Sequence, residues 1–348
     1  MTGRRVVVCE VQVPFVRGGA EALVRELVRQ LRSRDYAVER VSVPFKWYPK
    51  EEILPHAAAW RLLDLSASNG QPIDAVIATK FPSYFVRHPS KVTWLIHQYR
   101  AAYELCGTEY SDFQHTEFDV GLRDQLIALD REMLMESRRL FTISRRTALR
   151  LRKFNGLEAE PLYHPSRLAA RLRSGPSGNY VLSVGRIESI KRVDLAIRAM
   201  EYVDRPIRLL VAGEGTQLES VRRITEQRGL DDRVAFLGAV SDDELVELYA
   251  GALGVVYVPY EEDYGYVTLE SFLAHKPVIT THDSGGPLEF VEHDVNGLIG
   301  DPEPSALGEA INRLAANRTV AASFGDAGYD RGKTVTWDGV IEKLLGHL

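Results

Sequence analysis

Few features of this 348-residue sequence connect it to a disulfide framework, a metal site or a membrane span. Its two cysteines, Cys9 and Cys106, have neither metal-ligand spacing nor the pattern of a disulfide framework, which favours a reducing, cytoplasmic setting. The apolar run near the start ends at Glu10, and no later run is long enough to cross a bilayer. We therefore expect a cytoplasmic protein that is soluble or lies at the inner face of a membrane.

Several catalytic signatures are also absent. No Asp-x-Asp pair occurs, which disfavours a transferase that holds a diphosphate through a carboxylate-bound cation. The first expected strand lacks the Gly-x-Gly-x-x-Gly fingerprint of dinucleotide-binding enzymes, and neither a Walker loop nor a Gly-x-Ser-x-Gly elbow is present. We therefore expect neither a metal nor a cofactor.

The formal net charge of -5 conceals an asymmetry between two halves of the chain. Residues 1–168 contain 25 Lys and Arg against 20 Asp and Glu, whereas the remainder contains 18 against 28. A basic first half and an acidic second half indicate different partners for the two parts. The acidic total argues against nucleic acid as one of them.

Apolar runs of strand length alternate with amphipathic helical segments, as in doubly wound α/β domains. The Gly- and Ser-containing segment 171–179 interrupts this alternation and predicts a linker. We expect two Rossmann-like domains, residues 1–168 and 169–333, with the ligand in the cleft between them. Strands are expected at residues 6–11, 38–43, 75–78, 92–96, 140–142, 180–184, 208–212, 234–237, 254–258 and 278–281.

The stretch Tyr257–Ser271 is the most informative part of the sequence. It leaves a buried strand through an acidic, aromatic turn and enters a helix near Gly265. Glu262 precedes this helix and Glu270 lies about a turn and a half inside it, so the two carboxylates suit two ends of one extended ligand. The N–H groups of the first helical turn between them favour an anion. This layout fits a sugar nucleotide.

Two cations and one histidine follow expected strands. Arg186 and Lys191 come after residues 180–184, where a guanidinium fork and an ammonium would neutralise a diphosphate. Isolated surface cations are more often simply solvated, but these two share a domain with both glutamates. His97 ends the strand at residues 92–96; a lone histidine there is usually structural, yet this position makes it a candidate for contact with a donor sugar or an acceptor.

Two further segments have open interpretations. Gly18 and Gly19 follow the first strand and would let the backbone approach a phosphate or a sugar. Residues 138–153 contain seven cations and no acid, which fits either a solvated helix face or attraction to anionic lipid head groups or a lipid-diphosphate acceptor. These cations are Arg138, Arg139, Arg145, Arg146, Arg150, Arg152 and Lys153.

Together the motifs resemble those of family-4 glycosyltransferases, which have the GT-B fold. Glu262 and Glu270 match the family's Glu-x7-Glu motif, with Tyr264-Gly265 where Phe-Gly is usual. The match is close over the second domain and loose over the first. The other matching segments are Val184-Gly185-Arg186 with Lys191-Arg192, Ala212-Gly213-Glu214-Gly215, Gly285-Gly286-Pro287-Leu288-Glu289 with Asn296-Gly297-Leu298, and Gly18-Gly19-Ala20-Glu21.

The resemblance implies a retaining, metal-independent transfer from a UDP- or GDP-linked sugar to an acceptor, a glycolipid or polysaccharide precursor. Arg186 and Lys191, beside Gly185, would bind the diphosphate and stabilise its charge as the glycosidic bond breaks. Glu262 would hold the donor sugar and Glu270 the ribose. The remaining implied contacts are backbone N–H groups of Tyr266 and Val267 to the distal phosphate and His97 near the sugar or acceptor.

The resemblance also implies that a final helix at residues 337–345 crosses back, so that residues 334–348 complete the first domain. Two residues depart from the family pattern: His275 replaces the glycine before Lys-Pro, and Gln98 replaces the Asp or Asn after the histidine. Two alternative functions are a GT-B sugar-nucleotide epimerase, which needs no separate acceptor, and a non-catalytic sugar-nucleotide-binding partner subunit. Retention of both glutamates with Arg186 and Lys191 counts against the latter.

The missing Asp-x-Asp pair generates a first prediction. Because cationic side chains and a helix end would neutralise the diphosphate, transferase activity should be unchanged by EDTA. Activity that is abolished by EDTA and restored by a divalent cation would contradict this expectation; it is measured as product formed with and without chelator.

Overall fold

The computed structural model describes residues 3–16, 18–204 and 206–346 and divides the chain into two compact units. The first unit comprises Met1–His164 and Thr336–Leu348, and the second comprises Pro165–Val335. The chain therefore passes into the second unit at Pro165 and returns at Thr336. No described helix is both long and apolar enough to span a bilayer.

The first unit is built on a six-stranded parallel sheet with the strand order β2-β1-β5-β6-β7-β8. Its strands are β1 (Arg5–Gln12), β2 (Ala37–Pro44), β5 (Ala75–Ala78), β6 (Lys91–Leu95), β7 (Arg139–Thr142) and β8 (Glu160–Pro161), and β3 (Ala67–Ser68) and β4 (Gln71–Pro72) form a separate hairpin. Its helices are α1 (Gly19–Arg32), α2 (Ile53–Arg61), α3 (Glu117–Met135), α4 (Arg145–Asn155) and α11 (Trp337–Leu345).

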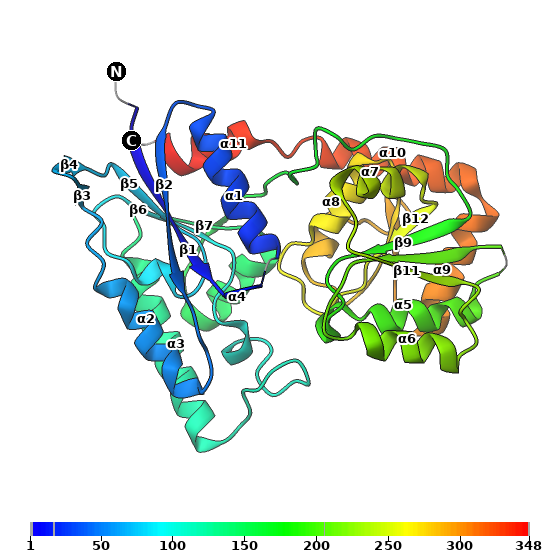
Figure 1. The fold of residues 1–348 in the computed structure, drawn as a ribbon, viewed down its shortest axis with the longest axis horizontal. Helices are drawn as coiled ribbons and strands as arrows, with labels where there is room; N and C mark the ends of the chain where they lie inside the picture. The colour runs from blue at the N-terminus through cyan, green and yellow to red at the C-terminus, as the bar shows by residue number, and fades with distance from the viewer. Residues whose placement is uncertain (1–2, 17, 205, 347–348) are drawn as a thin grey trace. The chain divides into compact units, whose positions relative to one another are not determined.

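Strand β1 is buried on both faces, as the uninterrupted apolar run predicts. Val7 and Cys9 pack into a core with residues of α2 and α3, while the equally buried Val6 and Val8 alternate to the opposite face. Helix α1 lies on that opposite face (Figure 1). Its buried residues recur at helical spacing: Leu23, Val24, Leu27, Val28 and Leu31.

The last helix, α11, belongs to the first unit, as the resemblance implied. Trp337 is 9 % exposed, and its ring centroid lies 6.2 Å from that of Trp94 and 6.1 Å from that of His164. Arg34, just beyond α1, forms an ion pair with Asp338 of α11. Aromatic packing and this ion pair thus fix the returning segment on the first sheet.

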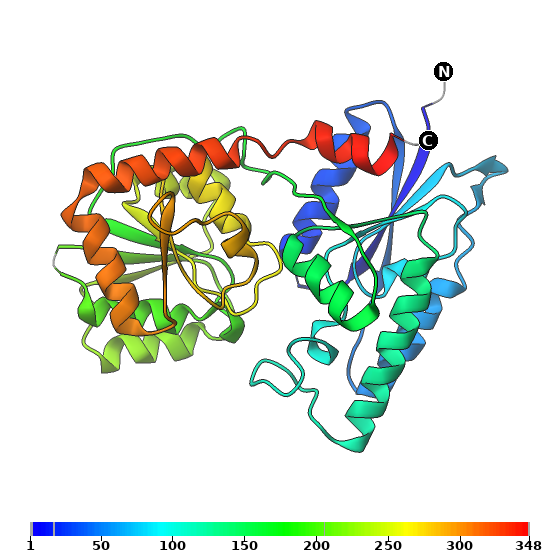
Figure 2. The same cartoon turned by 180° about the vertical axis from the view of Figure 1, so that it is seen from behind.

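The second unit is also a doubly wound parallel sheet, with the strand order β11-β10-β9-β12-β13-β14. Figures 1 and 2 show α5 and α6 on one face of this sheet and α7 and α8 on the other. The strands are β9 (Tyr180–Val184), β10 (Arg208–Ala212), β11 (Val234–Gly238), β12 (Gly254–Val256), β13 (Val278–Thr281) and β14 (Gly297–Gly300). The helices are α5 (Val193–Ala199), α6 (Leu218–Gln227), α7 (Asp242–Gly251), α8 (Tyr266–Leu273), α9 (Pro304–Ala316) and α10 (Arg318–Gly332).

The linker predicted at residues 171–179 is wrong, because this segment is bound within the second unit. The buried Lys276 donates from Nζ to the carbonyl oxygen of Gly175 at 2.8 Å and to Ser177 Oγ at 3.1 Å. Arg318 donates to the carbonyl oxygens of Ser177 and Gly178. Composition alone indicated a flexible connection, but side chains about 100 residues or more away in sequence anchor it.

Candidate functional site

The strand order of the second sheet brings the loop after β9 next to the acidic turn after β12. β9 lies between β10 and β12, where the strand order reverses, and ligands of such sheets bind at the carboxyl ends of the strands there. The backbone N–H of Tyr260 donates to the carbonyl oxygen of Ile190 at 2.8 Å, which joins the two loops. The predicted phosphate loop and the two-glutamate stretch therefore lie at one edge.

Arg192 holds the acidic turn in place. Its guanidinium donates to the carbonyl oxygens of Val258 (2.8 Å) and Pro259 (2.9 Å), and it forms two 2.7 Å contacts with the carboxylate of Asp283. It also donates to Thr281 Oγ1 at 2.9 Å. The sequence placed Arg192 beside Lys191 in one motif but gave no sign that it connects the ends of β12 and β13.

Lys191 and Glu262 form an ion pair with each other. Their side chains are 19 % and 18 % exposed, and the Lys191 ammonium lies 5.9 Å from the centre of the Tyr257 ring. Burial, followed by the charge of Glu262 and a hydrogen bond to it, raises the pKa of Tyr257 well above its usual range. Lys191, the residue expected to bind the diphosphate, and Glu262, the residue expected to bind the sugar, are thus in direct contact in the structure.

Arg186 is the exposed cation of this site. Within the described residues its guanidinium has no hydrogen bond or ion pair, and it is close enough to lower the pKa of Tyr257 against the larger opposing effects. Gly185, which precedes it, has a φ of 135°. The adjoining Gly213 approaches so closely that a Cβ there would lie 1.9 Å from the Gly185 carbonyl oxygen, so only glycine allows the two loops to meet.

Helix α8 begins as the sequence predicted, with Gly265 at its N-cap in the left-handed region (φ 81°). Because the N-cap residue is a glycine, it supplies no side-chain cap to the N–H groups of the first helical turn. Tyr264 is 3 % exposed and packs edge-on against Phe290, with ring centroids 5.6 Å apart. The arrangement suits an anion at the helix start.

Glu270 is almost completely enclosed, with 8 % of its surface exposed. Ser166 Oγ donates to one carboxylate oxygen at 2.5 Å, and the Tyr249 hydroxyl donates to the other at 2.9 Å. Burial raises the pKa of Glu270, against the smaller lowering effects of the two hydroxyls. The sequence gave no signal for Ser166 or Tyr249, because both are far from Glu270 in the chain.

The other predicted site residues belong to the first unit. The loops that follow its parallel strands β1, β5 and β6 start at the same edge of the sheet. The Gly18 N–H donates to the Glu21 carboxylate at 2.8 Å, and Glu21 also pairs with Lys80 at 2.6 Å. Burial alone would raise the pKa of Glu21, but Lys80 and hydrogen bonds lower it. The Gly18 N–H is therefore already hydrogen-bonded to the Glu21 carboxylate of the chain itself. The predicted anion contact then falls to Gly19 and the other N–H groups at the start of α1.

His97 follows β6 and is partly exposed. Its Nδ1 lies 2.7 Å from the carbonyl oxygen of Gln98, a contact that places the proton on Nδ1 and makes Nε2 the acceptor of the neutral ring. Gln98 is completely buried; it accepts from Arg150 Nε at 2.9 Å and donates to Asn155 at 3.2 Å. Gln98 is thus a packing residue in this chain.

The seven cations of residues 138–153 do not form a single solvent-exposed face. Arg150 is 5 % exposed and binds Glu104 at 2.8 Å as well as Gln98, so it is not part of a membrane-facing surface. Arg139 donates to the carbonyl oxygen of Lys343 in α11 at 2.9 Å. Counting charges along the sequence overestimated this surface, because one helical face of α4 points inward.

Comparisons with known proteins agree with the geometry. Residues 167–331 match the sequence model of the family described as "Glycosyl transferases group 1". The human alpha-1,3/1,6-mannosyltransferase ALG2 is 32 % identical over 169 residues, which cover 44 % of this chain and 40 % of that protein. The D-inositol 3-phosphate glycosyltransferase of Corynebacterium diphtheriae is 26 % identical over 170 residues, 46 % of this chain and 40 % of that one. The matches thus span about two fifths of these relatives.

Solved structures extend the likeness to the whole chain. Sucrose-phosphate synthase from Thermosynechococcus elongatus has a TM-score of 0.73 at 20 % identity, covering 99 % of this chain and 98 % of that one. HepE from Anabaena, solved in complex with UDP, has a TM-score of 0.72 at 16 % identity, covering 99 % and 100 %. The solved structures confirm the predicted GT-B fold, and the family match and the sequence relatives confirm the resemblance to glycosyltransferases.

The enclosed carboxylate generates a prediction about stability. Glu270→Gln should raise the thermal unfolding midpoint at pH 7 by about 2 °C or more, because it removes a buried charge while keeping a group that can bond to both hydroxyls. Because its pKa is raised on folding, Glu270 costs no stability below its usual value of 4.5 and lowers stability as pH rises through the folded pKa. The advantage of Gln should therefore vanish as pH falls towards 4.

Scanning calorimetry of both proteins from pH 4 to 8 measures this difference. Glu226→Gln, an exposed carboxylate on α6, is the matched control and should change neither midpoint nor pH dependence. A lower unfolding midpoint for Glu270→Gln than for the wild type at pH 7 would show that the buried charge of Glu270 does not lower stability.

Proposed function

We propose that the protein, whose residues 167–331 match the family model "Glycosyl transferases group 1", transfers a sugar from a UDP- or GDP-linked donor to an acceptor, with retention at the anomeric carbon and without a metal. One observation carries the proposal. Arg186, the Lys191–Glu262 pair, the start of α8 at Gly265 and Glu270 lie along one edge of the second sheet. The names of the relatives, a mannosyltransferase and an inositol phosphate glycosyltransferase, support sugar transfer.

In this proposal the diphosphate lies between the loop after β9 and the start of α8. Arg186 offers a guanidinium fork with no protein partner in the described chain, and the α8 N–H groups add a positive helix end. The departing diphosphate gains negative charge as the sugar becomes oxocarbenium-like. Fixed cations aimed at that charge would stabilise the transition state more than the bound donor.

When the donor binds, Lys191 and Glu262 would each exchange the other for a group of the donor. A phosphate oxygen would take over the Lys191 ammonium, and the released Glu262 carboxylate would accept hydrogen bonds from hydroxyl groups of the sugar. Both groups keep a partner at each stage, which avoids an unpaired charge in a partly buried site. Glu270 would bind the ribose hydroxyls, and His97 Nε2 is assigned to the sugar or acceptor side.

We propose a glycolipid or polysaccharide precursor as the acceptor, handled at the cytoplasmic side of a membrane. The exposed Arg138, Arg145 and Lys153 would supply the attraction to anionic head groups, without the buried Arg150.

The assigned roles of the two glutamates are separable by experiment. Glu270→Ala should weaken UDP or GDP binding by about tenfold or more, since it removes a charge-assisted contact to ribose. Glu262→Ala should mainly reduce turnover, because its contact is to the sugar. Isothermal titration with UDP, GDP and ADP measures the nucleotide affinity of each variant. Transfer assays, with the sugar nucleotide whose diphosphate binds most tightly, measure turnover.

Arg223→Ala on α6 removes an exposed arginine of the same unit and is the matched control. Unchanged nucleotide affinity in Glu270→Ala would reject the ribose assignment. A modified sugar nucleotide formed from donor alone would instead favour the epimerase.

A further inference from the structure

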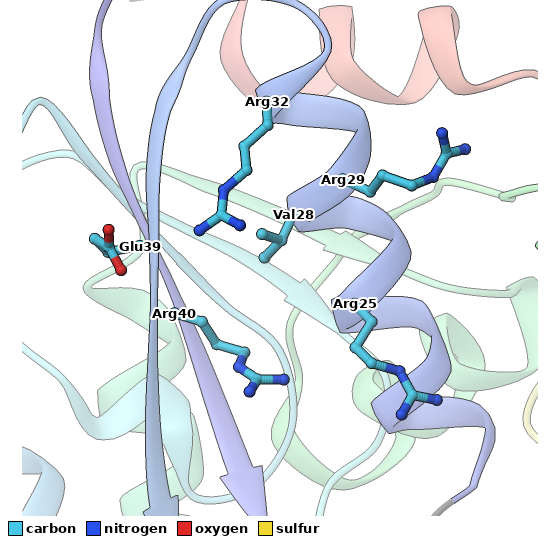
Figure 3. Close-up of a pocket in the computed structure, with 6 residues that line it drawn as sticks. All are labelled: Arg25, Val28, Arg29, Arg32, Glu39 and Arg40. Carbon is cyan, nitrogen blue, oxygen red and sulfur yellow. The ribbon is translucent and has the colours of Figure 1, made fainter.

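A cluster of cationic side chains lies in the first unit, between helix α1 and the edge strand β2. A cavity of about 450 Å³ opens there, lined by Arg25, Val28, Arg29, Arg32, Glu39 and Arg40. Figure 3 shows Arg32 and Arg40 extending from the helix and the strand into the space around Val28, whereas Arg29 and Glu39 point away from it. Nothing in the proposed transfer reaction uses these residues.

Most of the donor groups in this cavity are not used by the chain itself. Each guanidinium carries five N–H donors. Within the described residues, Arg25 and Arg40 donate no hydrogen bond, and Arg32 uses only Nη2, which donates to the Val38 carbonyl oxygen at 2.9 Å. Two of the arginines have acidic partners: Arg29 is hydrogen-bonded to Glu26, and Arg40 forms an ion pair with Glu10. The contact to Val38 holds the Arg32 guanidinium at the strand edge while its other N–H groups stay available.

The charge of the cavity is compensated only in part: among the described residues Arg29 pairs with Glu26 and Arg40 with Glu10, whereas Arg25 and Arg32 have no ion pair. Arg25, Arg29 and Arg32 have i, i+4 and i+7 spacing on one helical face, an arrangement in which like charges repel. Arg29 and Arg32 lie in the last turn of α1, where the helix dipole favours cations, but Arg25 and the strand residue Arg40 gain nothing from that dipole. Arg40 forms an ion pair with the buried Glu10, with 3.4 Å between Nη1 and Oε2. Stability alone therefore does not explain the cluster.

The shape and composition of the cavity indicate the kind of ligand. Its volume lies in the range of small-molecule sites. None of the exposed large apolar side chains of the described residues lines it, so it lacks the apolar groups with which a protein inserts into a bilayer. All its cations are arginines, whose planar forks match phosphate oxygens in pairs.

We propose that the cavity between α1 and β2 binds a small, multiply charged phosphate compound. The ligand bridges Arg25 and Arg32 of the helix to Arg40 of the strand, and this bridge stabilises the open edge of the first sheet. The site is independent of the nucleotide site of the second unit.

Hydrogen exchange of the full-length protein with inorganic pyrophosphate tests this proposal at constant ionic strength. Peptides covering residues 25–40 should exchange more slowly with pyrophosphate, and the pyrophosphate concentration for half-maximal protection should rise about tenfold or more in Arg25→Glu/Arg40→Glu. Arg87→Glu, an exposed arginine of the same unit outside the cavity, should retain full protection. Arg25→Lys/Arg40→Lys keeps the charge and should weaken protection through loss of the forks.

Succinate and phosphatidylglycerol vesicles separate the ligand classes. Weaker protection by succinate than by pyrophosphate supports recognition of phosphate. No protection by pyrophosphate in the wild type, equal protection by succinate, or protection by vesicles alone would each overturn the proposal. Protection of residues 185–192 by pyrophosphate reports the nucleotide site separately.

Discussion

The geometry of the proposed nucleotide site depends on the guanidinium of Arg192. This side chain starts in the loop after β9 and binds the carbonyl oxygens at the end of β12 and the carboxylate of Asp283 after β13. Hydrogen bonds to charged groups contribute about 1.5–3 kcal/mol each. The acidic turn between β12 and α8 contains Glu262 and leads to Glu270. Arg192 therefore fixes both glutamates relative to the loop after β9.

The two glutamates differ in how they meet a ligand. Glu262 is paired with Lys191, and in the proposed reaction it would exchange this partner for the donor sugar. Glu270 has two hydroxyl donors, one on each oxygen, and a carboxylate oxygen accepts more than one hydrogen bond. The ribose hydroxyls of the proposed donor would therefore add to the Ser166 and Tyr249 contacts without breaking them. The two hydroxyls orient the Glu270 carboxylate before a ligand binds, but burial of its charge lowers the stability of the free protein.

The sequence predicted those features that depend on neighbouring residues. The start of α8 at Gly265, the strand before it and the positions of Arg186 and Lys191 at a strand end follow from local apolar patterns and glycine. It could not predict contacts that depend on strand order, such as the Lys191–Glu262 pair and Arg192. The linker error has the same cause, because Lys276 anchors residues 174–178 from a distant part of the chain.

Hydrogen exchange with and without the tightest-binding nucleoside diphosphate tests whether the loop after β9, the acidic turn and the start of α8 form one nucleotide site. We expect slower exchange in residues 185–192 and 260–270, where the loop after β9, the acidic turn and the start of α8 come together. Protection confined to other segments, with these two unchanged, would contradict this expectation.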